Sequence, residues 1–285
     1  MTPFPEVEAI LESSGYQKSP DGIFTSGREG YWSNLDKVEN EELIKDLEKL
    51  GPRGAVRKTI PQYEDIIFSP SREGALELLH INKGDVAIDY GCMWGVLSIG
   101  LAKRGAHVLA IDQTLDSLKF LSSRAKSEKL DNVLCVQDDI REVRMSDLAD
   151  FSIVNGVLEW VPEFGTIELK KYYGKKISKS YGDMDPEQTQ VSFLQQVHKN
   201  LKIGGKLLLA IENRFDYTHF LGKPDPHPNL LFTAFLPRAI ANLISKLTLG
   251  RPYVNYIYSF PKLKDLLIKR FTCSLYSCLL LTNHH

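Results

Sequence analysis

The chain has 285 residues, 43% of them hydrophobic and 25% charged, a globular composition that excludes fibrous and disordered classes. Its 35 Lys and Arg residues balance 36 Asp and Glu residues, so no overall positive field attracts nucleic acid, and we expect none as a partner. Four scattered cysteines, no secretory signal pattern and no run of about 20 apolar residues predict a cytoplasmic protein without stable membrane insertion.

The first 79 residues are polar and helical in pattern, most clearly over 40–50, and we expect them to form an N-terminal helical cap. From residue 85 onward, short β-rich runs alternate with helical patterns, as a parallel sheet with crossover helices requires. The sequence therefore predicts an α/β core over residues 80–285. We expect its strands at 86–90, 107–111, 133–137, 151–154 and 206–212, and its helices at 96–104, 115–129 and 189–201.

Two insertions interrupt this predicted core. Residues 165–186 are rich in Lys and Tyr, and we interpret them as a surface loop whose lysines form a solvated face or, alternatively, an anion site. Residues 213–262 form a longer excursion after the strand at 206–212, a position from which such segments shape pockets. Within it, residues 230–249 carry an apolar stripe that predicts either a lid packed on the core or a surface resting on a bilayer.

The residues that indicate a ligand lie where two predicted strands end. Gly91 and Gly95 follow the strand at 86–90, and glycines at such a turn let a nucleotide-type ligand approach the backbone closely. Asp112 ends the next strand, where an acid accepts hydrogen bonds from ribose hydroxyls. The dinucleotide pattern G-x-G-x-x-G fails because Met93 and Val96 occupy two of its glycine positions, which argues against nicotinamide and flavin cofactors.

These residues resemble the first motif of the class I S-adenosylmethionine-dependent methyltransferases, in which an acid stands two residues before the first glycine, as Asp89 does here. Segments 136–140, 155–162 and 201–209 resemble later motifs of that family, in the same order. The resemblance implies a Rossmann-like, doubly wound, mostly parallel seven-stranded sheet whose last strand is absent or short. It also implies S-adenosylmethionine as cofactor, S-adenosylhomocysteine as product, and a cofactor site at Asp89, Gly91, Cys92, Gly95, Asp112, Gln113, Asp138, Asp139, Ile140 and Asn155.

The sequence departs from this motif at its centre. Met93 stands where the family has its middle glycine, and Trp94 follows it, so we expect a bulkier turn that alters how the methionine end of the cofactor lies.

A finer resemblance is to bacterial methyltransferases of glycan and polysaccharide assembly, carried by the segments 69–73, 211–215 and 225–228. It implies a small-molecule substrate and O-methylation of a sugar or glycan intermediate. We expect His227 to act as general base with Asp225 orienting it, and Glu159 is the alternative base. We expect substrate contacts at Trp160, Asn213, Arg214, Tyr31 and Arg72.

Several alternatives stay open on the sequence alone. The acceptor atom can be nitrogen or carbon of another small metabolite, or the chain can be a non-catalytic cofactor-binding partner in a biosynthetic complex. Asp139 also suits a helix N-cap, Glu159 and Trp160 suit packing positions, and His227 suits a rigid surface loop. A homodimer is an open alternative, because a sheet of this type often buries an outer helix against a copy of itself. We expect no metal site.

Overall fold

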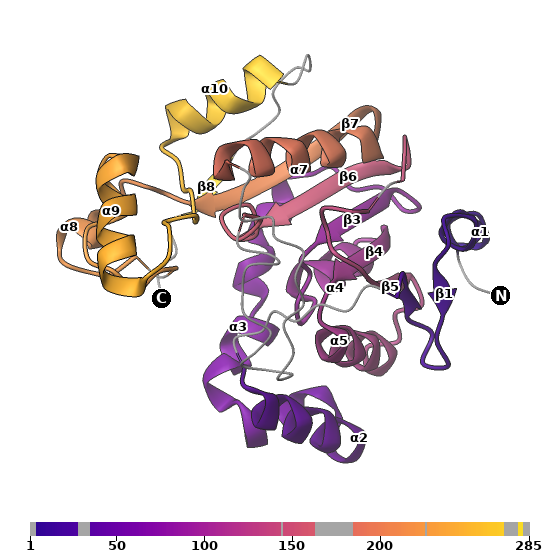
Figure 1. Ribbon diagram of the computed structural model, residues 1–285. Coiled ribbons are helices and arrows are strands. Elements are labelled where there is room, and N and C mark those ends of the chain that lie inside the picture. The colour runs from indigo at the N-terminus through magenta and orange to yellow at the C-terminus, as the bar shows by residue number, and fades with distance from the viewer. Residues whose placement is uncertain are drawn as a thin grey trace. The chain divides into compact units, whose positions relative to one another are not determined.

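The computed structural model describes residues 4–27, 35–143, 145–162, 185–225, 227–270 and 279–281 (Figure 1). The predicted substrate residue Tyr31 and nearly all of the predicted insertion 165–186 lie outside these ranges. The chain forms two compact units, which we describe separately. Unit 1 consists of Met1–Ile153, Leu169–Lys175 and Lys199–Leu207, and unit 2 of Val154–Glu168, Lys176–His198 and Leu208–His285.

The described strands form one sheet in the order β1-β2-β5-β4-β3-β6-β7-β8. Its centre in unit 1 consists of β3 (Val86–Tyr90), β4 (His107–Asp112) and β5 (Val133–Gln137), which pair in parallel with Ala87 opposite Val108 and Ala110 opposite Cys135. The strands β6 (Ala149–Asn155) and β7 (Leu201–Glu212) begin in unit 1 and end in unit 2. Because the strand order reverses between β3 and β6, the sheet is doubly wound, which confirms the predicted fold class.

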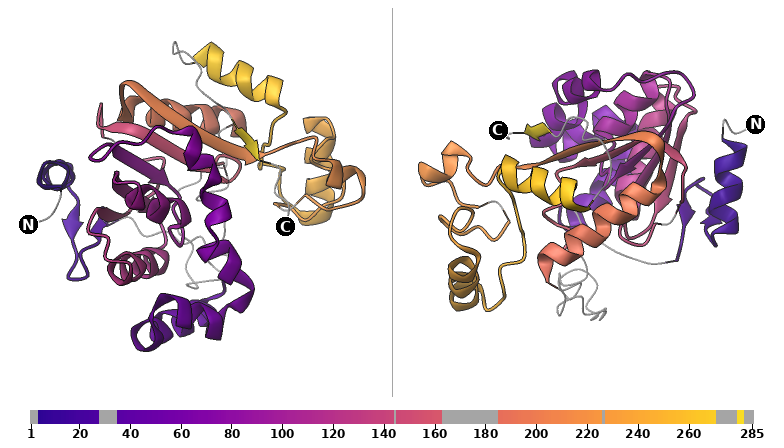
Figure 2. Two further views of the ribbon diagram at one scale, coloured as in Figure 1. Left: turned by 180° about the vertical axis from the view of Figure 1, so that it is seen from behind. Right: turned by 90° about the horizontal axis from the view of Figure 1, so that it is seen from above.

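An N-terminal hairpin extends the sheet beyond the strands that the sequence predicts. After α1 (Pro5–Ser13), β1 (Gln17–Lys18) pairs antiparallel with β2 (Phe24–Thr25), and β2 pairs in parallel with the edge of β5. The indigo segment therefore lies beside the sheet edge in both views of Figure 2. Strands of two residues are too short for an alternating pattern, so the sequence showed only the helical part of residues 1–79.

The helices of unit 1 follow their sequence signals closely. The helices α4 (Val96–Lys103) and α5 (Leu115–Ser127) lie within the predicted ranges. The helix α2 (Lys37–Thr59) begins at a capping box, in which Asp36 and Glu39 satisfy each other's main-chain N–H groups, and it kinks at Gly51. The short helices η1 (Pro61–Tyr63), α3 (Glu64–Phe68) and η2 (Pro70–Leu78) lead to β3.

Unit 2 contains the end of β6, most of α7 (Pro186–Asn200), the end of β7 and the segments that follow β7. These segments include α8 (Tyr217–Phe220), α9 (Arg238–Leu249) and α10 (Phe260–Arg270). A three-residue strand, β8 (Leu279–Leu281), pairs in parallel with the last residues of β7. The sheet thus has a short last strand. Within the described ranges, no helix combines the length and the apolar character needed to cross a bilayer.

Candidate functional site

The turn between β3 and α4 is held tightly by the main chain. Gly91 and Cys92 donate their N–H groups to the carbonyl of Ile111 at 2.8 and 3.1 Å. Gly95 has φ 73°, and a Cβ atom placed on it would lie 2.1 Å from a methyl carbon of Leu121. Only glycine combines this left-handed conformation with so little space, so the structure explains why the motif requires glycine at this position.

Met93 replaces the middle glycine of this turn without changing its handedness. Its φ is 50°, a conformation that costs a residue with a side chain about 1–2 kcal/mol. The side chain packs against a buried apolar cluster that includes Trp94, Phe120 and residues of α2. Trp94 is 3% exposed, and its ring centre lies 5.0 Å from that of Tyr63. The two bulky residues are thus accommodated in the core of unit 1.

Asp112, the last residue of β4, fastens this turn to the strand end. Its Oδ2 atom accepts the N–H of Met93 at 2.9 Å, and its Oδ1 atom accepts the N–H of Thr114 at 2.8 Å. Burial raises the pKa of Asp112 to about 6, although these two N–H groups oppose the rise. The side chain of Thr114 and the main chain of Gln113 also hydrogen-bond this carboxylate and oppose the rise of its pKa, so the protein holds it at several points beside the turn.

Asp89, the acid at the end of β3, is also buried. Its Oδ2 atom accepts a hydrogen bond from the hydroxyl of Ser98 in α4 at 2.6 Å. Burial raises its pKa to about 7, and the negative charge of Asp112 contributes to the rise. The glycine turn is therefore flanked by two carboxyl groups whose charged forms are costly until a cation or hydrogen-bond donors approach.

The aspartates after β5 have partners within the protein. Asp138 is fully buried and accepts hydrogen bonds from the hydroxyls of Tyr16 and Ser26, at 2.5 and 2.7 Å. Asp139 pairs with Arg141, which donates from Nε and from a terminal nitrogen. The N-terminal hairpin thus engages the Asp138 side chain, a role for Tyr16 and Ser26 that no sequence signal suggested.

The remaining predicted cofactor residues lie in both units. In unit 1, Cys92 and Ile140 are buried, and the carbonyl of Gln113 accepts a hydrogen bond from Gln137 at 3.4 Å. Asn155, the last residue of β6, is half-buried and belongs to unit 2.

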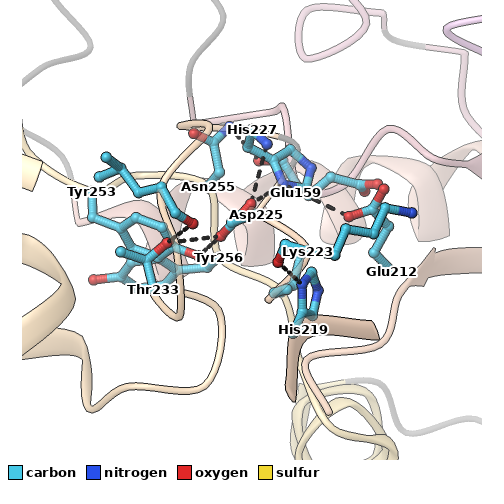
Figure 3. Close-up of polar contacts among 12 residues, drawn as sticks. Glu159, Glu212, His219, Lys223, Asp225, His227, Thr233, Tyr253, Asn255 and Tyr256 are labelled. Atoms are coloured by element: carbon cyan, nitrogen blue, oxygen red, sulfur yellow. Dashed lines mark hydrogen bonds and ion pairs between the residues drawn. The ribbon is translucent and has the colours of Figure 1, made fainter. Parts of the chain in front are cut away.

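A second polar cluster lies in unit 2 and centres on His227 (Figure 3). The Nδ1 atom of His227 lies 2.8 Å from Oδ1 of Asp225, and the Nδ1 atom also lies 3.8 Å from Glu212. The other oxygen of Asp225 accepts the hydroxyl of Tyr253 at 2.8 Å. The Glu159 side chain points toward the same group. Three carboxyl groups therefore surround one imidazole.

Two atoms of this cluster have unused hydrogen-bonding capacity. Within the described part of the chain, neither Nε2 of His227 nor Oε2 of Glu159 has a hydrogen-bond partner, and both atoms are buried. Such atoms cost about 1–3 kcal/mol each in a folded protein, so a ligand that supplied the missing partners would be stabilised here.

Electrostatics assign the proton positions in the cluster. Burial works to raise the pKa of Asp225, but the hydrogen bond from His227 and its charge hold that pKa below the ordinary value. Asp225 is therefore ionised, Nδ1 of His227 carries a proton, and Nε2 of the neutral ring has a free lone pair. Burial acts to lower the pKa of His227, but the Asp225 hydrogen bond and the surrounding carboxylates raise it above 6.5. Burial raises the pKa of Glu159 to about 7.

The predicted substrate residues fall into different surroundings. The Trp160 ring lies 4.6 Å from the His227 ring, so it belongs to the cluster. Arg214 donates to the main-chain carbonyls of Ala234 and Leu236, at 2.9 and 2.7 Å, which fastens the loop before α9. Asn213 accepts the N–H of Phe215 in a local turn.

Two further predicted substrate residues are not described as members of this cluster. Arg72 lies in η2 of unit 1, where partial burial lowers its pKa. Tyr31 lies outside the described residues.

Sequence reasoning missed two members of the cluster as functional residues. Glu212 ends β7 and lies in the segment 211–215 that was singled out, so its place at a strand end was the available signal. Tyr253 lies 28 residues after Asp225 in a stretch without a motif, and only the folded chain joins them.

Comparison with known proteins gives a family match. The model of a methyltransferase domain matches residues 81–223, which is half of the chain. Among solved structures, an Aquifex aeolicus SAM-dependent methyltransferase is 13% identical, over 76% of this chain and 86% of that one, with a TM-score of 0.44. The CcbJ methyltransferase of Streptomyces caelestis is 15% identical over 49% and 48%, with a TM-score of 0.38.

A Bacillus halodurans protein put forward as a methyltransferase is 14% identical over 69% of this chain and 66% of that one, with a TM-score of 0.44. This chain thus spans just under two thirds of that relative.

Proposed function

Because this chain belongs to the family of methyltransferase domains, we propose that it transfers the methyl group of S-adenosylmethionine to a hydroxyl oxygen of a sugar or glycan intermediate. The observation that carries the choice of oxygen is the buried, unpartnered Nε2 atom of His227, whose ring is oriented by Asp225. A hydroxyl must lose its proton when it is methylated, and this arrangement is that of a general base.

The turn at residues 91–95 and the carboxylate of Asp112 suit the cofactor. Gly91 and Gly95 place no side chain on the turn, and in our proposal Asp112, the last residue of β4, binds the ribose hydroxyls. When bound, S-adenosylmethionine supplies a methyl group activated by a positively charged sulfur. In our proposal the further cofactor residues are Asp89, Cys92, Gln113, Asp138, Asp139, Ile140 and Asn155.

His227 removes the acceptor proton in this proposal. Its Nε2 atom accepts the proton, while the ionised Asp225 stabilises the resulting imidazolium through the Nδ1 hydrogen bond. Tyr253 keeps Asp225 in place through the second oxygen. General-base catalysis of this kind contributes a rate factor of about 10²–10⁴.

Glu159 and Trp160 suit a polyhydroxylated acceptor. The unpartnered Oε2 atom of Glu159 can accept a hydrogen bond from a second hydroxyl next to the reacting one, and Trp160 offers an apolar ring face to a sugar. The carboxyl groups of Glu159, Glu212 and Asp225 disfavour a phosphate or carboxylate at this place by like-charge repulsion. A neutral diol therefore fits better than an anionic acceptor.

Calorimetry with S-adenosylhomocysteine tests the cofactor part of the proposal. We expect saturable binding and an affinity about 10–100-fold lower in Asp112→Asn, because hydrogen bonds to a charged group contribute about 1.5–3 kcal/mol. Asp116→Asn, on the next helix, is the matched control and should bind like the unaltered chain. An unchanged affinity in Asp112→Asn would contradict the assigned site.

A methyl-transfer assay tests the acceptor part. Radiolabelled S-adenosylmethionine is incubated with a panel of sugars, amines and carbon acceptors, and we expect label on sugar hydroxyls. Transfer to amines or carbon alone would contradict oxygen as the acceptor. Cofactor binding without transfer to any acceptor, together with a co-purifying enzyme, would instead support a non-catalytic partner.

A further inference from the structure

The helix α9 (Arg238–Leu249), labelled in Figure 1, carries large apolar side chains on its solvent-exposed side. An amphipathic helix of a globular protein normally buries its large apolar residues. In α9 the buried positions are the small residues Ala241 and Ser245, one turn apart. On the opposite side Ile240, Leu243 and Leu247 are 47%, 57% and 77% exposed. The large apolar residues of α9 therefore lie on its exposed side and the small residues on its buried side, the reverse of the usual arrangement in a globular protein.

The three exposed residues form one continuous stripe. They are spaced by three and four residues, which places them on one face of an α-helix. Leu249 and, before the helix, Leu231 and Phe232 are also exposed within the same unit. Contiguous exposed apolar surface of this kind marks an interaction site. The lid that the sequence offered as one alternative would have buried this stripe.

The charged residues near the stripe indicate which kind of partner binds it. Residues 226–264 contain no Asp or Glu but five Lys or Arg, whereas the rest of the chain has 30 Lys or Arg and 36 Asp or Glu. Lys246 lies on α9 beside the stripe, and Arg251 follows the helix; both are exposed. Lysine and arginine at the flank of an apolar helix face bring their charges to the headgroup level of a bilayer.

We propose that α9 docks unit 2 on the surface of an anionic phospholipid bilayer, with Ile240, Leu243 and Leu247 in the interface and Lys246 and Arg251 at the headgroups. The helix lies on the bilayer and does not cross it, because its 12 residues are too few for a span. A second copy of the chain is the alternative occupant, and the oligomeric state of the substituted protein, described below, distinguishes it from a bilayer. Docking is independent of the proposed chemistry.

Vesicle flotation of the full chain tests this docking. We expect the protein to float with vesicles of phosphatidylglycerol and phosphatidylcholine, and at least tenfold less with phosphatidylcholine alone. Raising the salt from 50 to 500 mM should reduce the bound fraction, because screening weakens the attraction of Lys246 and Arg251 to the headgroups.

Substitutions on α9 identify the surface responsible. The double variant Leu243→Ser and Leu247→Ser should lose most of the bound fraction and still fold, because both side chains are exposed. Leu50→Ser, at a 50% exposed leucine of α2, is the matched control and should bind vesicles like the unaltered chain. Circular dichroism and S-adenosylhomocysteine binding verify folding of each variant.

Three results would overturn the proposal. The first is absence of the unaltered chain from floated anionic vesicles. The second is equal flotation of the double variant and the unaltered chain. The third is a dimer in solution that the double variant dissociates while vesicles bind neither protein, which would assign the stripe to a second copy.

Discussion

His227 is held by a carboxylate that fixes both its tautomer and its charge. The hydrogen bond from Nδ1 to Asp225 leaves Nε2 as the only ring atom able to accept a proton. The same bond raises the pKa of His227, so the base is partly protonated near neutral pH. In our proposal His227 therefore acts as a base more readily in mildly alkaline than in mildly acidic solution.

This charge state predicts the pH dependence of the reaction. We expect kcat to rise with pH through a midpoint above 6.5, because His227 must lose its proton before it can act as a base. In Asp225→Asn the carboxylate that raises this pKa is gone, so the midpoint should move to lower pH and kcat should fall about 10-fold or more. The measurement is the pH profile of kcat for both proteins.

His219→Gln is a matched control for this comparison. His219 is also a buried histidine of unit 2, but its Nδ1 atom lies 3.3 Å from the main-chain carbonyl of Lys223, whereas that of His227 lies 2.8 Å from the Asp225 carboxylate. Its replacement should leave the midpoint unchanged. A profile for Asp225→Asn that coincides with that of the unaltered chain would show that Asp225 does not set the charge of the base.

From the sequence, individual functional residues could be predicted only where they belong to a recognisable motif. Resemblance to a family pointed to Asp112, His227 and Asp225, and the structure joins the last two by a hydrogen bond. The sequence alone could not predict the contact between Tyr253 and Asp225. These residues are 28 positions apart, and their contact depends on how the segment after β7 folds back. The assigned roles of all these residues stay predictions until they are tested.

Among the elements, the turn from β3 to α4 depends most on its residue types. Gly95 is both in the left-handed region and in contact range of Leu121, whereas Met93 adopts a similar φ with its side chain directed to an apolar cluster. The turn therefore tolerates a side chain at its centre but not at its end.

Gly95→Ala should destabilise unit 1 strongly. The left-handed conformation costs about 1–2 kcal/mol, and the added Cβ forces Leu121 to move, which adds about 1–3 kcal/mol of overpacking. Thermal unfolding followed by circular dichroism measures the change. Gly74→Ala is the control, since a Cβ there meets no atom within 4 Å, and a similar melting temperature for both variants would refute the argument.

The regular elements of the core were predictable because burial imposes a pattern on them. The strand β5 was predicted with its observed bounds, and α4 and β4 differ from prediction by one residue at one end. The hairpin β1/β2 was missed because two residues carry no period and its partner lies more than 100 residues away. Its place is decided by the open edge of β5.

In the molecule as a whole, buried carboxyl groups lower the stability of the fold as the pH rises toward 7. Burial raises the pKa values of Asp89 and Glu159 to about 7 and that of Asp112 to about 6. Between their ordinary values near 4 and these raised values, the folded chain binds more protons than the unfolded chain. The contribution of these groups to the free energy of unfolding is therefore fully present below about pH 4, and it is lost as the pH rises toward 7.

We expect the free energy of unfolding to be lower at pH 8 than at pH 5.5, as measured by urea denaturation without cofactor. Asp89→Asn should reduce this difference, because the amide of the same shape needs no proton to remain uncharged. Asp131→Asn, at an exposed position, should leave it unchanged. Stability that increases from pH 5.5 to 8 in the unaltered chain would contradict the assignment.

The hydrogen bond from Tyr16 to Asp138 connects residues 122 positions apart, and Phe24 of β2 pairs with Val136. On a translating ribosome, the nascent N-terminus emerges long before its docking site exists. At about 5–20 residues per second, that delay lasts roughly 6–24 s. Ile23 and Phe24, both buried in the finished protein, must stay exposed or be shielded by a chaperone throughout that interval.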